Sequence, residues 1–167
     1  MDEITWPSEF LEFLRCCTRH GAKTLVFGGF AVSLHARPRT TGDLDLWCGL
    51  DATNWERIKA ALVEFGFEKS RIALLDEPRP NVMLRFGYEP IRIELFTSVA
   101  DLDFDHAWER RYTLYDAGLE ITFLDRESLI RSKIAAGRPQ DLADLEQLRR
   151  CERTSNEPPA NKSKSSE

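Results

Sequence analysis

The sequence has no long apolar run and no leader-like beginning. None of its 167 residues belongs to a stretch near the ~18 consecutive apolar residues of a membrane span. The first residues, Met-Asp-Glu-Ile-Thr-Trp-Pro, lack the basic and then apolar order of a signal peptide. We therefore expect a cytoplasmic protein that has no membrane partner.

Residues that bind zinc or form disulfides are also scarce. Of the four cysteines, none stands in a Cys-x-x-Cys motif, and no histidine pair has the spacing of a zinc site. We expect reduced thiols in core or surface positions, and structural roles for His20 and His35. A formal net charge of −5 likewise argues against a protein that coats nucleic acid by electrostatics alone.

What is present is the composition of an ordinary globular domain. Hydrophobic residues make up 42% of the chain and charged residues 31%. The length suits one domain with one core, which we place at residues 1–151. The last residues, 152–167, are rich in Ser, Pro, Lys and Glu and predict a disordered polar tail.

Hydrophobic periodicity and turn residues predict helices that alternate with strands. Helices are expected over 7–21, 28–36, 53–66, 125–137 and 139–150. Strands are expected over 24–27, 43–48, 67–74, 82–86 and 91–96, and, after an irregular segment at 97–105, as a hairpin over 112–115 and 119–123. This order predicts an α/β (α+β) fold, in which a mixed β-sheet has flanking helices and a C-terminal helical segment.

The segment from Leu25 to Trp47 carries the chemistry. Gly28 and Gly29 follow a strand and open a helix, where free backbone N–H groups and the helix dipole favour a phosphate group. A Gly-Gly pair of this kind is also compatible with a plain tight turn.

Asp43 and Asp45 are separated by one residue on the next strand. The two-residue period of a strand places both carboxylates on one face of the sheet, with Leu44 and Leu46 on the other. Neighbouring carboxylates repel each other unless a cation joins them, and their oxygens suit Mg²⁺ or Mn²⁺. The alternative is a solvated strand end without a ligand.

Two motifs together resemble a known family over roughly residues 24–148. Gly28-Gly29 followed by Arg39-x-Thr41-x-Asp43-x-Asp45 resembles the signature of nucleotidyltransferases of the DNA polymerase β-like superfamily. The later motif Leu129-Ile-x-x-Lys133-x-Ala-Ala-Gly-Arg138-Pro-x-Asp141-Leu-x-Asp144-Leu is similar to a C-terminal helix motif of small bacterial nucleotidyltransferases. That group is related to abortive-infection and type IV toxin proteins, and small antibiotic nucleotidyltransferases, such as those for lincosamides, share its plan.

The resemblance implies a third metal-binding carboxylate on a later strand of the same sheet. Glu94 is the acid within the strand over 91–96, although the family more often has aspartate there. Asp43, Asp45 and Glu94 are then the catalytic, metal-binding residues for Mg²⁺ or Mn²⁺, and Glu94 accepts a proton. The alternative for Glu94 is a surface acid paired with Arg85 or Arg92.

The same resemblance implies a set of nucleotide-binding residues, namely Gly28, Gly29, Arg39, Thr41 and Lys133. Lys133 and Arg138 would neutralise phosphates, whereas the alternative for both is solvation near a helix end. Asp141 and Asp144 lie on one helical face and are expected to position these two cations through ion pairs.

The function implied is a Mg²⁺-dependent nucleotidyltransferase that moves NMP from an NTP such as ATP to an acceptor hydroxyl. The acceptor is RNA (a tRNA end), a protein or a small molecule, and a toxin-type enzyme would have an antitoxin as partner. A second copy of the chain, in a homodimer, could supply a missing wall of the site. The alternatives are a non-catalytic nucleotide-binding or regulatory protein that keeps the fold, and an antibiotic nucleotidyltransferase.

Overall fold

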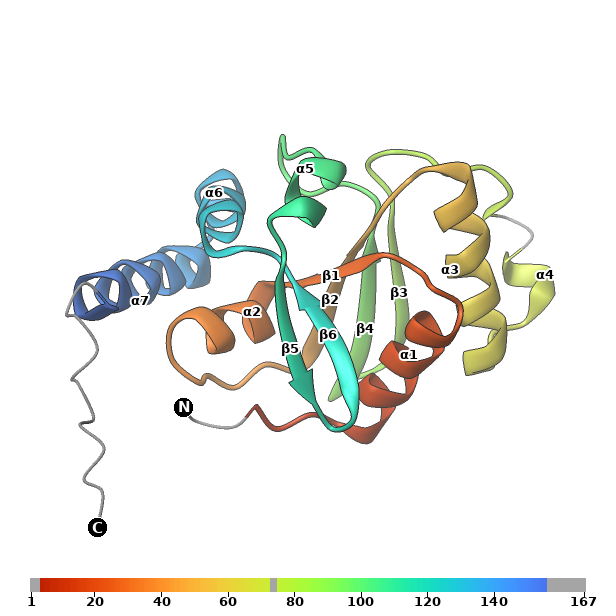
Figure 1. Ribbon diagram of the computed structural model, residues 1–167, viewed down its shortest axis with the longest axis horizontal. Helices are drawn as coiled ribbons and strands as arrows, with labels where there is room; N and C mark the ends of the chain where they lie inside the picture. Colours follow the sequence, from red (N-terminus) through yellow and green to blue (C-terminus); the bar gives the residue numbers. More distant parts are fainter. Residues whose placement is uncertain (1–3, 73–74, 156–167) are drawn as a thin grey trace, which may run out of the picture.

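One mixed sheet organises the chain in the computed structural model, which describes residues 4–72 and 75–155 (Figure 1). Its strands are β1 (Thr24–Phe27), β2 (Asp43–Cys48), β3 (Met83–Tyr88), β4 (Ile91–Phe96), β5 (Tyr112–Asp116) and β6 (Leu119–Phe123). They lie in the order β3-β4-β2-β1-β6-β5. Strand β2 runs antiparallel to β1 and parallel to β4, and β6 runs parallel to β1. The predicted fold class, a mixed sheet with flanking helices, is confirmed.

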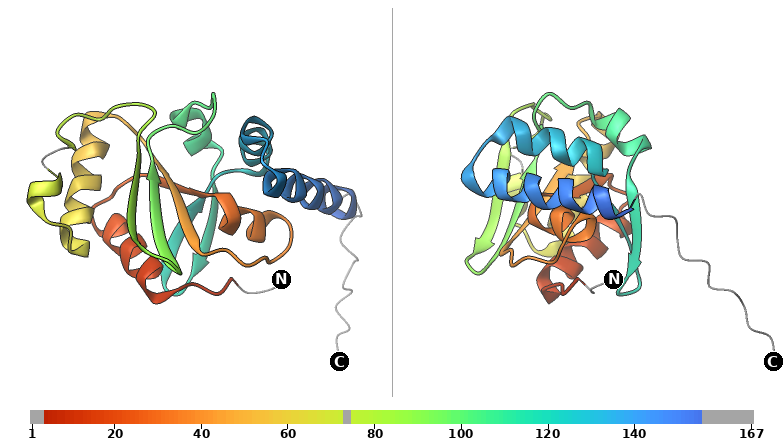
Figure 2. Two further views of the ribbon diagram at one scale, coloured as in Figure 1. Left: turned by 180° about the vertical axis from the view of Figure 1, so that it is seen from behind. Right: turned by 90° about the vertical axis from the view of Figure 1, so that its left-hand side faces the viewer.

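Helices cover both sides of this sheet (Figures 1 and 2). On one side lie α1 (Ser8–Arg19), α3 (Ala52–Phe65) and α4 (Lys69–Ile72). On the other side lie α2 (Gly28–His35), α5 (Phe104–Glu109), α6 (Arg126–Ala136) and α7 (Pro139–Ser155). Helices α6 and α7 pack against each other and against α2, so this pair stands over the end of the sheet where α2 begins.

The apolar periodicity of the sequence appears directly in the core. Phe10, Phe13 and Leu14 form the buried face of α1, as the spacing predicts. On β2, Leu44 and Leu46 are fully buried, whereas Asp43 and Asp45 are half-buried on the opposite face. The sheet therefore presents one apolar face to the core and carries both aspartates on the other.

Three elements differ from the sequence prediction. The strand expected over 67–74 is wrong, because residues 69–72 form the short helix α4 (residues 73 and 74 lie outside the described chain). The polar run Glu68–Arg71 cannot alternate apolar and polar faces as a strand would, and the carbonyl of Glu68 accepts hydrogen bonds from the next turn. Helix α5 begins inside the segment expected to be irregular, since the Asp103 carboxylate caps it by accepting from the backbone N–H of His106.

Helix α7 also runs further than expected, to Ser155, and so enters the segment assigned to a tail; residues 156–167 lie outside the described chain.

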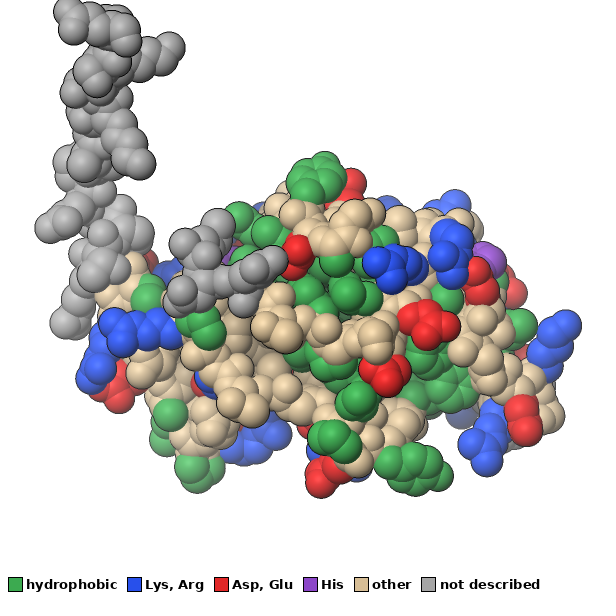
Figure 3. Space-filling model, turned by 90° about the horizontal axis from the view of Figure 1, so that it is seen from below, with side chains coloured by type: hydrophobic (Ala, Val, Ile, Leu, Met, Phe, Trp, Pro, Cys, Tyr) green, Lys and Arg blue, Asp and Glu red, His purple; other side chains and the backbone are tan. Residues whose placement is uncertain are grey.

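Seen from below, basic and acidic side chains are interspersed around an apolar centre (Figure 3). Cys16, Cys17 and Cys48 are buried free thiols. Within residues 4–72 and 75–155, none of the helices has the combined length and apolar character needed to cross a membrane.

Candidate active site

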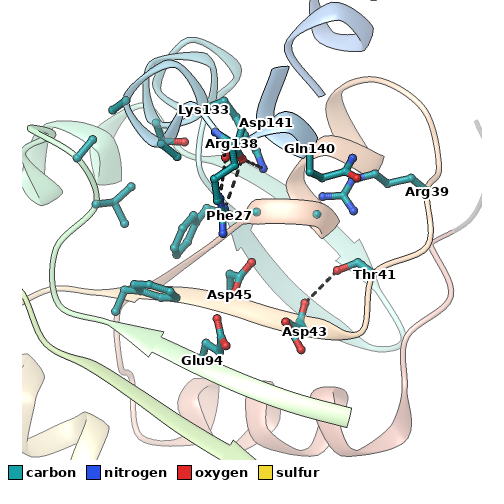
Figure 4. Close-up of a pocket in the computed structure, with 18 of the residues that line it drawn as sticks. Phe27, Arg39, Thr41, Asp43, Asp45, Glu94, Lys133, Arg138, Gln140 and Asp141 are labelled. Atoms are coloured by element: carbon teal, nitrogen blue, oxygen red, sulfur yellow. Dashed lines mark hydrogen bonds and ion pairs between the residues drawn. The ribbon is translucent and has the colours of Figure 1, made fainter. Parts of the chain in front are cut away.

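A cleft of about 730 Å³ lies between the sheet and the α6–α7 pair. Its walls come from the β1–α2 junction, the loop before β2, strands β2 and β4, and the facing ends of α6 and α7. The predicted site residues all line it, namely Gly28, Gly29, Arg39, Thr41, Asp43, Asp45, Glu94 and Lys133 (Figure 4). The cleft thus brings together two motifs that are far apart in the sequence.

Strand register places the three acidic side chains on the floor of the cleft. In the parallel pairing of β2 with β4, Asp45 lies directly opposite Glu94. Asp43, two residues earlier, points to the same face (Figure 4). Glu94 is only 8% exposed. It is therefore not the surface acid of the alternative interpretation, although it does have an arginine partner.

Asp45 and Glu94 lie side by side in the register of β2 and β4, and each carboxyl group lies within reach of the other's charge. Burial and, next to it, the charge of Glu94 raise the pKa of Asp45 to about 7, while Lys133 acts in the opposite direction. Adjacent carboxylates repel each other when both are ionised, and a cation between them would relieve that repulsion.

Two arginines pair with the outer carboxylates. Arg92 donates from Nε and NH2 to both oxygens of Asp43, at 2.9 and 3.0 Å. Arg85 donates from Nε to Oε1 of Glu94 at 2.9 Å, and its NH2 lies 2.7 Å from the same oxygen. The hydrogen bonds from Arg92 to Asp43 raise the pKa of that arginine, which remains a cation. Only Asp45 faces the cleft without an arginine partner among the described residues.

Gly28 permits this arrangement because a side chain at its position would collide with Asp45. Its φ of +63° lies in the left-handed region, and a Cβ there would stand 2.0 Å from Oδ2 of Asp45. A Cβ on Gly29 would stand 2.6 Å from Oγ1 of Thr41. The two glycines open α2, which has no side-chain cap and no acid in its first turn. Its first amides therefore offer hydrogen-bond donors for an anion beside the carboxylates.

A buried network of ion pairs holds Lys133 at the opposite wall. Lys133 is 5% exposed, and its Nζ lies 3.0 Å from Oδ1 of Asp141 and 2.9 Å from Oδ2 of Asp144. Arg138 pairs with Asp141 at 2.8 Å, and Arg39 pairs with Asp144 at 2.9 Å. The expected ion pairs are present: both aspartates pair with Lys133, and Asp141 also pairs with Arg138.

The charges in this network keep Asp141 ionised. Burial alone would raise the pKa of Asp141, but hydrogen bonds from Arg138 and Lys133 outweigh burial and hold that pKa below its ordinary value. Arg39 also ties the loop before β2 to α7, while Thr41 donates from Oγ1 to the carbonyl of Asp43 at 3.3 Å. Both residues thus shape the loop that leads into the acidic strand.

The fit of a divalent cation can be judged from these contacts. No group of three or more His, Cys, Asp and Glu side chains within the described residues converges on one metal position. Asp45 and Glu94 are nevertheless adjacent and offer carboxylate oxygens, the ligands that Mg²⁺ and Mn²⁺ prefer. The donor set therefore fits a divalent cation at this pair, whereas both oxygens of Asp43 are engaged by Arg92.

Sequence reasoning missed several residues of the cleft. Phe27 and Phe96 meet edge to face at 5.0 Å on its floor, and Gln140 donates to Asp144 at 3.2 Å. The only signal for Phe27 was its position next to Gly28. His35, in contrast, has the structural role expected of it, because its Nε2 hydrogen-bonds to the carbonyl of Leu124.

Two solved structures share this fold. One is an antigenic nucleotidyltransferase-like protein from Paracoccidioides brasiliensis, with a TM-score of 0.51 and 15% identity over 86% of this chain and 74% of that one. The other is a candidate nucleotidyltransferase from Thermotoga maritima, with a TM-score of 0.54 and 16% identity over 87% of this chain and 96% of that one. No protein-family model matches the sequence, and no curated protein is similar to it. The likeness defines the class of fold, which is nucleotidyltransferase-like.

Proposed function

We propose that this protein is a Mg²⁺-dependent nucleotidyltransferase that moves NMP from an NTP to an acceptor hydroxyl. One observation carries the proposal. In a nucleotidyltransferase-like fold, a single cleft holds the paired carboxyls of Asp45 and Glu94, the Gly28–Gly29 helix start and the buried Lys133. Acids for a cation and donors for phosphates are the two requirements of phosphoryl transfer.

The residues divide the chemistry between them. In the proposed reaction the acceptor oxygen bonds to the α-phosphorus, the bond from that phosphorus to the β-phosphate oxygen breaks, and pyrophosphate leaves. The backbone N–H groups at Gly28 and Gly29, together with Lys133, bind phosphate oxygens. Bound Mg²⁺ would supply positive charge to the phosphates and to the attacking oxygen. Glu94, paired with Asp45, takes the proton of the acceptor hydroxyl.

The test is transfer of label from each α-³²P-labelled NTP in the presence of Mg²⁺ and cell extract. Wild type is compared with Asp43→Ala and Asp45→Ala, and with Asp101→Ala as a matched control for an exposed acid. We expect wild type and the control to transfer label. The rate of label transfer by the two cleft variants should fall by more than about 100-fold. Far-UV circular dichroism verifies that each variant is folded.

The opposite result would identify a non-catalytic protein that keeps the fold. The pairing of Asp43 and Glu94 with arginines is the observation that favours this second candidate, because those carboxylates already have counter-ions. Binding of nucleotide without Mg²⁺, with no label transfer and no effect of either substitution, would establish it and refute the enzyme.

The acceptor follows from where the label goes. We propose RNA (a tRNA end), a protein or a small molecule such as an antibiotic, and extraction of the labelled mixture into these three fractions distinguishes them. A toxin-type enzyme in the cytoplasm would label RNA or protein and would be inhibited by an antitoxin. Cross-linking tests for a homodimer that completes the site.

A further inference from the structure

A row of charged side chains crosses the sheet at the level of the candidate metal position. Arg85 on β3 lies directly opposite Glu94 on β4, and Glu94 lies directly opposite Asp45 on β2. One step along the same face, Arg92 on β4 lies directly opposite Asp43 on β2. Directly opposed residues share a face of the sheet, so the register itself imposes both arginine–carboxylate pairs.

We propose that Arg85 and Arg92 are counter-cations that compete with a divalent metal ion for Glu94 and Asp43. The inference rests on the proposed function, since it concerns the same carboxylates. It adds two residues that set how tightly the cation binds. A metal ligand strengthens metal binding, whereas these arginines weaken it.

The charges on the floor of the cleft explain why such cations are needed. Asp43, Asp45 and Glu94 lie on one face within the span of two strands, where their charges repel one another. Two arginines offset most of this charge when no metal is bound. The contacts are charge-assisted, and the pair between Arg92 and Asp43 engages both carboxylate oxygens.

The same contacts obstruct a metal ion. Both oxygens of Asp43 face Arg92, and Oε1 of Glu94 receives two nitrogens of Arg85. A cation that uses Asp43 must displace hydrogen bonds in a half-buried setting, because the side chain of Arg92 is 24% exposed. Arg85 is 50% exposed, so water compensates more readily for its displacement. Arg92 is therefore the stronger competitor of the two.

A second possible role for the arginines predicts the opposite change in metal binding when they are removed. If Arg85 and Arg92 mainly hold the carboxylates in the geometry that a metal needs, their removal weakens metal binding. If they compete, their removal strengthens it. The sign of one measured change thus separates the two roles.

The experiment is a Mn²⁺ titration of the full chain at about pH 8, followed by the electron paramagnetic resonance signal of free Mn²⁺. Wild type is compared with Arg85→Gln and Arg92→Gln. Arg131→Gln is the matched control, because Arg131 pairs with the exposed Asp101 away from the cleft. Asp45→Asn reports whether the bound Mn²⁺ uses the proposed position. The variants Arg85→Lys and Arg92→Lys keep the charge but lose the two-point contact, and they serve if a glutamine variant does not fold.

We expect Mn²⁺ to bind about ten-fold tighter to Arg92→Gln and about three-fold tighter to Arg85→Gln, with smaller gains for the lysine variants. Arg131→Gln should match wild type. Unchanged or weaker binding by the arginine variants, in a protein whose wild type binds Mn²⁺ through Asp45, overturns this inference and leaves the proposed function standing. If neither wild type nor any arginine variant binds Mn²⁺, both are overturned.

Discussion

At the scale of single residues, the cleft is governed by one unusual contact, the adjacent carboxyl groups of Asp45 and Glu94. Burial and the charge of Glu94 raise the pKa of Asp45 to about 7, so a proton on Asp45 relieves the repulsion between the two groups below that pH. The fold accepts this arrangement at a cost in stability, as functional sites commonly do. The contact can be tested without any substrate.

We predict that Asp45→Asn stabilises the metal-free protein above about pH 7. The pKa of Asp45 is raised from 3.8 to about 7, so the native state keeps a proton that the unfolded chain loses between these values. The free energy of unfolding of wild type therefore falls as pH rises through that window. Asparagine can donate to Glu94 at every pH, and the variant should be about 2 kcal/mol more stable at pH 8.

Urea unfolding in EDTA at several pH values between about 4 and 8 measures this difference. Asp101→Asn, which removes an exposed acid, is the control and should follow wild type. Equal pH slopes for wild type and Asp45→Asn would show that the carboxyl pair does not share a proton.

A second prediction at this scale concerns Gly28. Alanine at Gly28 adds both left-handed strain and a Cβ that would collide with Asp45, whereas alanine at Gly118 (φ +73°) adds strain with no atom within 4 Å. In urea unfolding, Gly118→Ala should lower the free energy of unfolding by about 1 kcal/mol, and Gly28→Ala should lower it by more than about 3 kcal/mol. Equal costs would mean that the approach of Asp45 to the helix start is loose.

At the scale of elements, the Lys133 network joins α6, α7 and the loop before β2 into one wall. Lys133 bridges two aspartates that are each 1% exposed, and Arg39 reaches one of them from the loop. A buried carboxylate that loses a cation partner is costly, and Lys133 is the one cation that contacts both aspartates among the described residues.

We therefore predict that Lys133→Met lowers the free energy of unfolding by about 3–5 kcal/mol. The matched change is Arg150→Met, which removes an exposed i,i+4 pair with Glu146 on α7 and should cost less than about 0.5 kcal/mol. Both values come from urea unfolding at neutral pH. A small effect of Lys133→Met would indicate that Arg39 and Arg138 suffice for the two aspartates.

Elements also show what the sequence could reveal and what it could not. The alternation of residues 43–46 predicted the two faces of β2. The helix expected over 125–137 is α6, and the Asp125 side chain caps it by accepting from the N–H of Ser128 at 3.0 Å. These are local signals. The short helix α4 was missed because its four residues are too few to show a helical period.

The sequence predicted only in part which charged side chains of the candidate site lie next to each other. A third carboxylate at Glu94 followed from the family resemblance, but its register against Asp45 is set by a parallel pairing that α3, α4 and β3 separate in sequence. No local spacing encodes such a register. The sequence allowed Arg85 or Arg92 as partners of Glu94, and the sheet assigns Arg85 to Glu94 and Arg92 to Asp43.

At the scale of the whole molecule, the cleft lies between two layers, the sheet and the α6–α7 pair (Figure 4). The proposed phosphate-binding groups come from both sides of the cleft, because the Gly28 and Gly29 amides lie at the β1–α2 junction and Lys133 lies on α6. The site is complete only when the C-terminal helices are docked, and their docking depends on buried Leu145 and Leu148 as well as on the ion pairs.

This arrangement predicts how truncation affects stability. A chain that ends at Arg138 loses α7, and with it two buried leucines worth about 1.5–3 kcal/mol each and both aspartate partners of Lys133. Its melting temperature should fall by more than about 10 °C. A chain that ends at Ser155 keeps all of α7 and loses only residues of the predicted tail, so we expect its melting temperature to stay within about 1 °C of wild type. Circular dichroism and tryptophan fluorescence should report one shared transition for the full chain, since α7 and the sheet unfold together. An unchanged melting temperature after removal of α7 would mean instead that the sheet folds on its own, and that the helical wall of the cleft is an independent unit.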